Sequence, residues 1–337
     1  MARMEAYDHV DANTVGMVAE GKRDSTVVVG GAANLVTIWI ISRRKCGLSK
    51  CVTVYMLAMA TTDLLVLINN VVLYYILSYH FPWSFLFHTA LCRVIMYLTA
   101  VTTDLSVWCV ICFTFDRFVL ICCRKIQTKY CTRRTSIKLV ITIAVVIVLK
   151  EIPVLFAYEP EQIINKVQWG CRSSEAFFSS SAGTGYVWFY SACVFWVPFS
   201  LIVLCNALII KRIVLANRAR NGLRSCKIGN ESDSEMENRR KSIILLFSIT
   251  VSFLLLCLPY AVALGVTKLA STIYVRGKFT DPELIAMESA DILWYFSCLL
   301  NPCIYAATQS KFRAELKNMA KCQWVLFWKS AGQMSAK

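Results

Sequence analysis

Seven long apolar runs divide this chain, and they restrict it to folds that place helices in a lipid bilayer. The runs lie at about 26–42, 52–79, 92–122, 136–158, 186–214, 242–266 and 284–308. Most of them exceed the roughly 20 residues that a helix needs to cross the hydrocarbon core. The chain is 57% hydrophobic and only 17% charged, which is too apolar for an ordinary soluble domain. The predicted fold is therefore all-α, a seven-transmembrane helix bundle.

Basic residues concentrate between particular runs, and their placement predicts the topology. Lysines and arginines are dense after the first, third and fifth runs and in the tail, whereas the other connections carry far fewer. The positive-inside rule then puts the amino terminus outside and the carboxyl terminus in the cytoplasm. The net charge of +15 is accounted for by this topology and by the membrane lipids of the inner leaflet, so nucleic acid is not an expected partner.

The same runs predict the domain organisation. Residues 1–25 are expected to form an extracellular segment, 26–308 the bundle, and 309–337 a short helix and a cytoplasmic tail. The longest polar insert, about 216–241, has an acidic centre between basic flanks and is predicted to be a mobile cytoplasmic loop. The first span is the weakest, because Gly30 and Gly31 lie inside it and charged residues abut it.

Most of the 16 cysteines lie within apolar runs or cytoplasmic segments, where a thiol behaves as a small buried hydrophobe. Two lie elsewhere. Cys92 opens the third span at its outer end, and Cys171 lies in the outer loop before the fifth span. Both face an oxidising compartment and could pair.

An acid and a base, Asp116 and Arg117, stand side by side near the end of the third run. The interval of 25 residues from Cys92 to Arg117 is long enough, at about 1.5 Å per residue, to span a bilayer. The pair therefore sits at the cytoplasmic mouth. Without further markers it would be interpreted as a helix end that anchors in the membrane interface.

Further markers do follow one another along the chain: Asn34, Leu57, Ala58, Asp63, Cys92, Asp116, Arg117, Phe118, Cys171, Pro198, Phe253, Pro259, Asn301, Pro302, Tyr305 and Phe312. In this order and spacing the chain resembles the rhodopsin-like G-protein-coupled receptors, over roughly residues 31–328. The resemblance implies a plasma-membrane receptor that is not an enzyme, with a heterotrimeric G protein as partner. It also implies that Asp116 holds Arg117 at rest and that Arg117 meets the G-protein α subunit on activation.

The resemblance assigns further residues to the activation switch. Pro259 and Pro302 are expected to act as pivots in the sixth and seventh spans. Cys257 stands where most relatives have a tryptophan whose reorientation reports ligand binding, which favours an altered switch and a raised basal activity. The remaining switch residues are Phe253, Asn301 and Tyr305.

An allosteric sodium ion is also implied, and no other cofactor. Its ligands would be Asp63, Ser106, Ser297 and Asn301, all of which supply the oxygen atoms that a hard cation prefers. Ser297 stands where the family more usually has asparagine. The alternative is that Asp63 is a protonated, hydrogen-bonded carboxyl group without a metal.

The outer halves of spans three, five, six and seven are expected to form the ligand cavity. Thr99 occupies the position of the carboxylate that anchors amines in aminergic receptors, which disfavours a monoamine. The other candidates are acids and aromatic residues: Asp104, Trp196, Tyr260, Glu288, Asp291 and Trp294. This mixture suits a small aromatic or zwitterionic molecule, or a short peptide. The fifth span looks most like that of an orphan branch associated with aromatic amino acids and short peptides.

A short amphipathic eighth helix is predicted at about 310–322. Phe312, Leu316 and Met319 fall on one face at helical spacing, and basic residues between them can reach lipid headgroups. Cys322 at its end is a candidate palmitoylation site.

Two other classes stay open. A membrane transporter would predict charged pairs through several spans, inverted repeats or broken helices, none of which the sequence clearly displays. A degenerate or constitutively active receptor is favoured by the weak first span and by Cys257.

Overall fold

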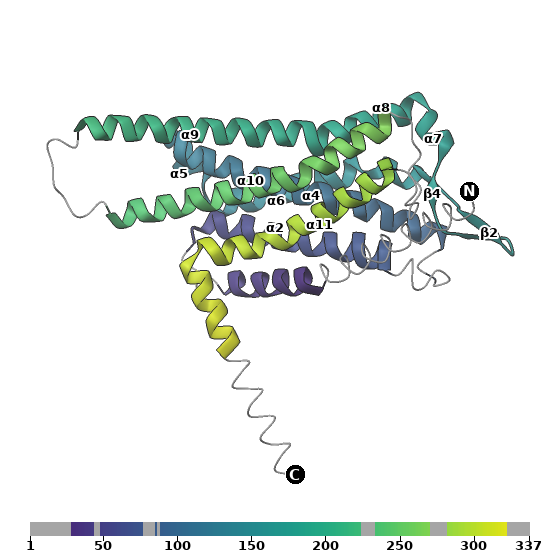
Figure 1. The fold of residues 1–337 in the computed structure, drawn as a ribbon, viewed down its shortest axis with the longest axis horizontal. Helices are drawn as coiled ribbons and strands as arrows, with labels where there is room; N and C mark the ends of the chain where they lie inside the picture. Colours follow the sequence, from purple (N-terminus) through teal and green to yellow (C-terminus); the bar gives the residue numbers. More distant parts are fainter. Residues whose placement is uncertain are drawn as a thin grey trace, which may run out of the picture.

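The computed structural model describes residues 28–43, 48–76, 85, 88–223, 233–269 and 282–321. The predicted extracellular segment 1–25 and the lipidation candidate Cys322 lie outside the described residues. Within the described part, long helices run along a common direction, and short strands lie at one end of them (Figure 1).

The helices follow one another along the chain as the apolar runs predict. The helix Val28–Ser42 comes first. The next elements are α2 (Lys50–Val66), η1 (Leu67–Ile76), α4 (Thr89–Cys122), α5 (Arg124–Tyr130), α6 (Arg133–Lys150) and η3 (Ile152–Phe156). After the strands come α7 (Glu175–Ser179), α8 (Ser181–Ser191), η4 (Ala192–Trp196), α9 (Val197–Leu223), α10 (Asp233–Leu269) and α11 (Pro282–Thr308). A last helix covers 310–321.

Helix α4 is the centre of the bundle, because it packs against α2, α6, α9 and α10. Its buried side chains run from Thr89 to Val119. The buried residues of the bundle form one apolar core, which extends from Ile40 in the first helix to Phe312 in the last. The positions along α4 therefore determine the depth at which the functional side chains lie.

Five of the described helices are long and apolar enough to cross a membrane: Lys50–Tyr74, Thr89–Cys122, Arg133–Phe156, Ser181–Ala216 and Ile243–Ala263. The shorter helix Val28–Ser42 and α11 complete the bundle. Asn34 joins these two, since its amide donates to the carbonyl of Cys298 at 3.0 Å. Gly30 lets the same helix approach η1, because a Cβ there would lie 3.0 Å from the end of the Leu67 side chain. The predicted all-helical bundle is confirmed.

Two boundaries differ from the sequence prediction. The fourth span was expected to run to residue 158, but α6 ends at Lys150 and tightens into η3, where Pro153 lacks the N–H that a continuing helix would need. The fifth and sixth helices extend into the range 216–241 that was predicted as a loop, with α9 ending at Leu223 and α10 beginning at Asp233.

A β-hairpin covers the end of the bundle at which α4 begins (Figure 1), and the sequence analysis did not predict it. Strand β1 (Tyr158–Glu159) pairs antiparallel with β4 (Arg172–Ser173), and β2 (Gln162–Ile164) pairs with β3 (Val167–Trp169). Asn165 and Lys166 form the turn with φ of 51° and 65°. Positive φ at both central residues is the mark of a two-residue hairpin turn whose twist matches that of its strands.

The helix 310–321 follows α11 after a sharp change of direction (Figure 1). Phe312 is 2% exposed and packs edge-on against Tyr305 of α11, with 6.2 Å between ring centroids. The guanidinium of Arg313 donates to the carbonyls of Ala306 at 3.0 Å and Ala307 at 2.7 Å. These bonds satisfy carbonyls that the end of α11 leaves unpaired. The predicted eighth helix is confirmed.

Candidate functional site

The Asp116 and Arg117 side chains form a buried ion pair near the carboxyl-terminal end of α4. The Arg117 Nε donates to the Asp116 carboxylate at 3.1 Å, and Nη2 donates to the same oxygen. Asp116 is completely buried and Arg117 is 3% exposed. The guanidinium also lies 5.9 Å from the ring centroid of Phe113. Removing one partner of such a buried pair leaves an uncompensated charge, at a cost of about 3–5 kcal/mol.

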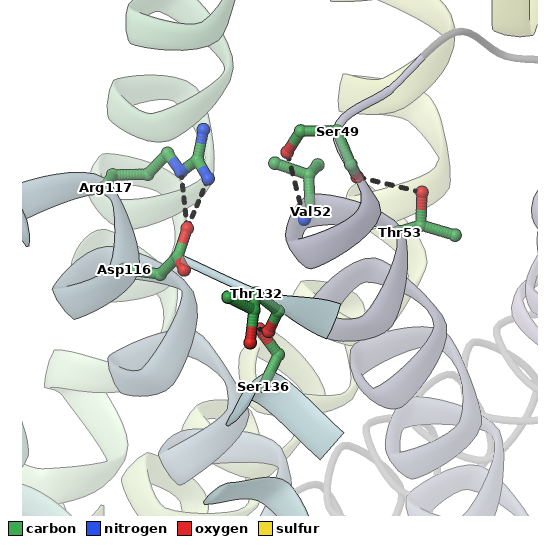
Figure 2. Close-up of polar contacts among 7 residues, drawn as sticks. All are labelled: Ser49, Val52, Thr53, Asp116, Arg117, Thr132 and Ser136. Carbon is green, nitrogen blue, oxygen red and sulfur yellow. Dashed lines mark hydrogen bonds and ion pairs between the residues drawn. The ribbon is translucent and has the colours of Figure 1, made fainter. Parts of the chain in front are cut away.

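The amino termini of α2 and α6 lie around this pair (Figure 2). Ser49 caps α2 and Thr132 caps α6, each accepting a backbone N–H with its side-chain oxygen. Ser136 is fully buried and donates to the Thr132 carbonyl at 3.1 Å. Burial, followed by the negative charge of Asp116, raises the pKa of the neighbouring Cys131 thiol to about 12.

A polar centre joins α2, α4 and α11 deeper in the bundle. One Asp63 carboxylate oxygen accepts from the Ser106 hydroxyl at 2.8 Å, and the other accepts from the Asn301 amide at 2.7 Å. Asp63 is 1% exposed. The Ser297 hydroxyl instead donates to the Trp294 carbonyl at 2.6 Å. The structure thus brings together three of the four residues predicted to bind sodium, and their oxygens are the kind of ligand that a hard cation takes.

Aromatic side chains fill the space beside this centre, where α9, α10 and α11 meet. The Trp294 indole lies 6.3 Å from the Phe253 ring and 5.5 Å from the Tyr260 ring. Phe195 packs edge-on against Trp294 at 6.0 Å, and Phe199 against Phe253 at 5.9 Å. These five residues are called the aromatic cluster below.

Cys257 lies next to the polar centre and is completely buried, with its sulfur 3.9 Å from the Ser297 hydroxyl. The two pivot candidates, Pro259 and Pro302, lie inside α10 and α11. The Tyr305 ring is fully buried on α11, and its hydroxyl has no hydrogen-bond partner among the described residues. The switch candidates of the sixth and seventh spans therefore lie on α10 and α11, the two helices that contribute Phe253, Tyr260 and Trp294 to the aromatic cluster.

The amino-terminal end of α4 holds the β-hairpin in place. Cys92 and Cys171 form a disulfide with 6.0 Å between their Cα atoms, so the predicted pairing is confirmed. The Arg93 Nε donates to the Tyr158 carbonyl at 2.8 Å, and the Thr89 hydroxyl donates to the Gly170 carbonyl at 2.8 Å. The start of α4 is thus bonded to β1 and to the residues that follow β3.

The predicted ligand residues do not all lie together. Trp294 and Tyr260 belong to the aromatic cluster, and Glu288 and Asp291 are 5% and 9% exposed on the outer part of α11. Thr99 is partly buried on α4, and its hydroxyl has no hydrogen-bond partner within the described ranges. Trp196 is 60% exposed and does not join the others. The reason is local, because the wide turn η4 shifts the register of the helix just before it enters α9.

Asp104, the remaining ligand candidate, is completely buried and pairs with a residue of another helix. The ammonium of Lys150 lies 3.0 Å from its carboxylate. Lys150 also pairs with Glu151, which accepts a hydrogen bond from the Tyr186 hydroxyl. This group of four residues connects the outer halves of α4, α6 and α8.

Residues 33–305 match the family model described as "7 transmembrane receptor (rhodopsin family)". The chain belongs to this family. Similar proteins include the Tachykinin-like peptides receptor 86C of Drosophila melanogaster, 24% identical over 307 residues. The Growth hormone secretagogue receptor type 1 of Oryctolagus cuniculus is 25% identical over 298 residues, and the Somatostatin receptor type 2 of Mus musculus is 24% identical over 298.

These alignments cover 86%, 85% and 87% of the receptor described here. The chain spans 56% of the length of the Drosophila relative, 76% of the rabbit one and 74% of the mouse one. The resemblance predicted from the sequence motifs is confirmed, and the protein is a multi-pass membrane receptor.

Sequence reasoning missed Lys150 and Glu151 in the interior of the receptor. A signal was available, because ionisable residues inside a membrane span usually pair or serve a function. The sequence could not show that Lys150 meets Asp104, since that contact depends on the rotation of α6 against α4.

Proposed function

We propose that this receptor resides in the plasma membrane with its amino terminus outside, binds an extracellular peptide and activates a heterotrimeric G protein. The observation that carries the proposal is the buried Asp116–Arg117 pair, which lies at the opposite end of α4 from the disulfide-linked hairpin. One helix therefore connects an outer face built to hold a ligand with an inner face built to hold a partner.

The pair suits coupling because Arg117 can exchange one negative partner for another. At rest, Asp116 neutralises the guanidinium within the protein. The carboxyl-terminal end of a G-protein helix presents unpaired carbonyls and partial negative charge, which a guanidinium can bind. Opening of the inner side by α10 and α11 would make that exchange possible, and both contain a proline at which they can bend.

A peptide is favoured over a small molecule by the outer hairpin. Strand β2 has β3 as its one strand partner among the described residues and is exposed along its length, with Ile163 69% exposed, so its other edge can pair with an extended segment. One relative is named for tachykinin-like peptides, which is consistent with this ligand class. A small aromatic or zwitterionic ligand is the second candidate, favoured by Glu288 and Asp291 next to the aromatic cluster.

Sodium is proposed as an allosteric ion at the polar centre. Asp63, Ser106 and Asn301 would hold it, because their side chains already converge. The bound cation would supply a positive charge that offsets the buried carboxylate.

The test is nucleotide exchange on purified G proteins by the receptor in lipid nanodiscs, with a panel that covers the Gα classes. The parent is expected to raise exchange above empty nanodiscs, since the switch departures favour basal activity. Arg117→Ala is expected to abolish that increase at matched receptor amounts. The exposed Arg134 on the same side provides the control, and Arg134→Ala is expected to stay close to the parent. Full exchange by Arg117→Ala contradicts the proposed coupling.

A further inference from the structure

Four ionisable or hydroxyl side chains meet in the outer half of the bundle, away from the coupling pair. The Lys150 ammonium is 3.0 Å from the Asp104 carboxylate and also pairs with Glu151. The Tyr186 hydroxyl donates to the second carboxylate oxygen of Glu151. This set, Asp104, Lys150, Glu151 and Tyr186, is called the ion cluster.

The charges of the ion cluster do not balance. Two carboxylates, both completely buried, face a single ammonium that is 11% exposed. A buried charge without a partner is strongly unfavourable in a membrane protein, and such groups pair or line a pathway. One further positive charge would complete the cluster.

The unpaired acceptor can be assigned to one atom. Glu151 uses one oxygen for Lys150 and the other for Tyr186. Asp104 uses Oδ2 for the ion pair, whereas its Oδ1 is fully buried and has no partner of ordinary hydrogen-bond geometry in the part of the chain that the structure describes, although the Trp108 side chain of the same helix also interacts with this carboxyl group. A carboxylate oxygen in this condition is an acceptor for an incoming N–H donor.

We propose that the ion cluster is a binding site for an organic cation, and that Asp104 accepts an ammonium or guanidinium group of the ligand. The inference deepens the proposed function and rests on it for the source of the cation, which is the amino terminus or a basic side chain of the peptide. Lys150 remains neutralised during binding, because Glu151 holds it while Asp104 turns to the ligand.

The surroundings suit a cation. The Lys150 ammonium already lies 5.2 Å from the Tyr190 ring and 5.9 Å from the Phe189 ring, so aromatic faces line the cluster. The depth of the cluster along α4 is one that a peptide segment can span. Asp104 follows Cys92 by 12 residues of α4, which is about 18 Å of helix. An extended peptide covers that depth with about five or six residues.

The experiment measures the thermal unfolding of the full-length receptor in nanodiscs with n-butylguanidinium and n-butylammonium as probes, and n-butylurea as the neutral control. Each cation is expected to raise the melting temperature saturably, because a ligand that binds only the folded state stabilises it. Asp104→Asn is expected to lose the rise. Lys150→Met is expected to bind the cations about tenfold more tightly, because it releases a second carboxylate.

Glu175→Gln is the control, since it neutralises an exposed carboxylate of α7 outside the ion cluster and should keep the rise. An equal rise in Asp104→Asn overturns the proposal, and so does an equal loss in Glu175→Gln and Asp104→Asn. Absence of any rise in the parent also overturns it. None of these outcomes bears on coupling, which the Arg117 variant tests separately.

Discussion

The Asn301 amide donates a 2.7 Å hydrogen bond to the Asp63 carboxylate, and this bond joins α11 to α2 across the centre of the bundle. Asn301 directly precedes Pro302, so the residue that binds Asp63 is next to the point where α11 can bend. A change in the charge of the polar centre can therefore bias the position of α11.

The first prediction concerns sodium at this centre. Replacing potassium by sodium at constant ionic strength is expected to raise the melting temperature of the parent, because a bound ion stabilises the folded state that holds it. Asp63→Asn keeps the size of the side chain but removes its charge, so the difference between the two salts should disappear. Ser297→Ala tests the fourth predicted ligand and should weaken the effect less than Asp63→Asn. The same melting temperature in both salts for the parent contradicts a sodium site.

The second prediction concerns the hairpin. Cys92→Ser or Cys171→Ser is expected to lower surface expression and to destabilise the receptor, by roughly 2–4 kcal/mol for a bridge that closes a long loop. Cys303→Ser is the control, because Cys303 is a free, exposed cysteine on α11. The measurement is surface labelling of tagged receptor in intact cells. Parental surface levels for both single variants would show that the bridge does not stabilise the fold.

The third prediction concerns the aromatic cluster. Trp294→Ala is expected to destabilise the receptor by about 3–5 kcal/mol, because it leaves a cavity among Phe195, Phe253 and Tyr260. Trp196→Ala removes the same side chain from an exposed position and should change the melting temperature much less. Equal losses for the two variants would mean that Trp294 does not support the cluster.

The sequence predicts the elements whose signals are local. Helix lengths follow from the apolar runs, and the depths of Cys92 and Arg117 follow from the constant rise of α4. The hairpin was missed because its strands are only two or three residues long. Such strands are too short for an alternation of apolar and polar residues to be recognised in the sequence. Its turn at Asn165 and Lys166 lacks the glycine that usually marks such turns.

The arrangement of the candidate site was harder to predict than its composition. Trp196 was expected in the pocket because of its residue type and span, but the turn η4 places it on the outside. The pairing of Asp104 with Lys150 depends on how two helices are rotated against each other, and residue spacing within each helix contains no information on that rotation. The Asp116–Arg117 pair was predictable because both partners are adjacent in the chain.

The last prediction separates a switch from an interface anchor at that pair. Asp116→Asn removes the negative partner of Arg117 but keeps the guanidinium, so Arg117 becomes available to the G protein without activation of the receptor. Basal nucleotide exchange is therefore expected to rise several-fold at matched surface level. Glu159→Gln, which neutralises a carboxylate of a partly exposed ion pair on the outer hairpin, should leave basal exchange unchanged. If the pair is only an anchor, Asp116→Asn lowers expression as Arg117→Ala does and raises exchange in neither case. A fall in exchange for Asp116→Asn at matched surface level would therefore exclude the switch.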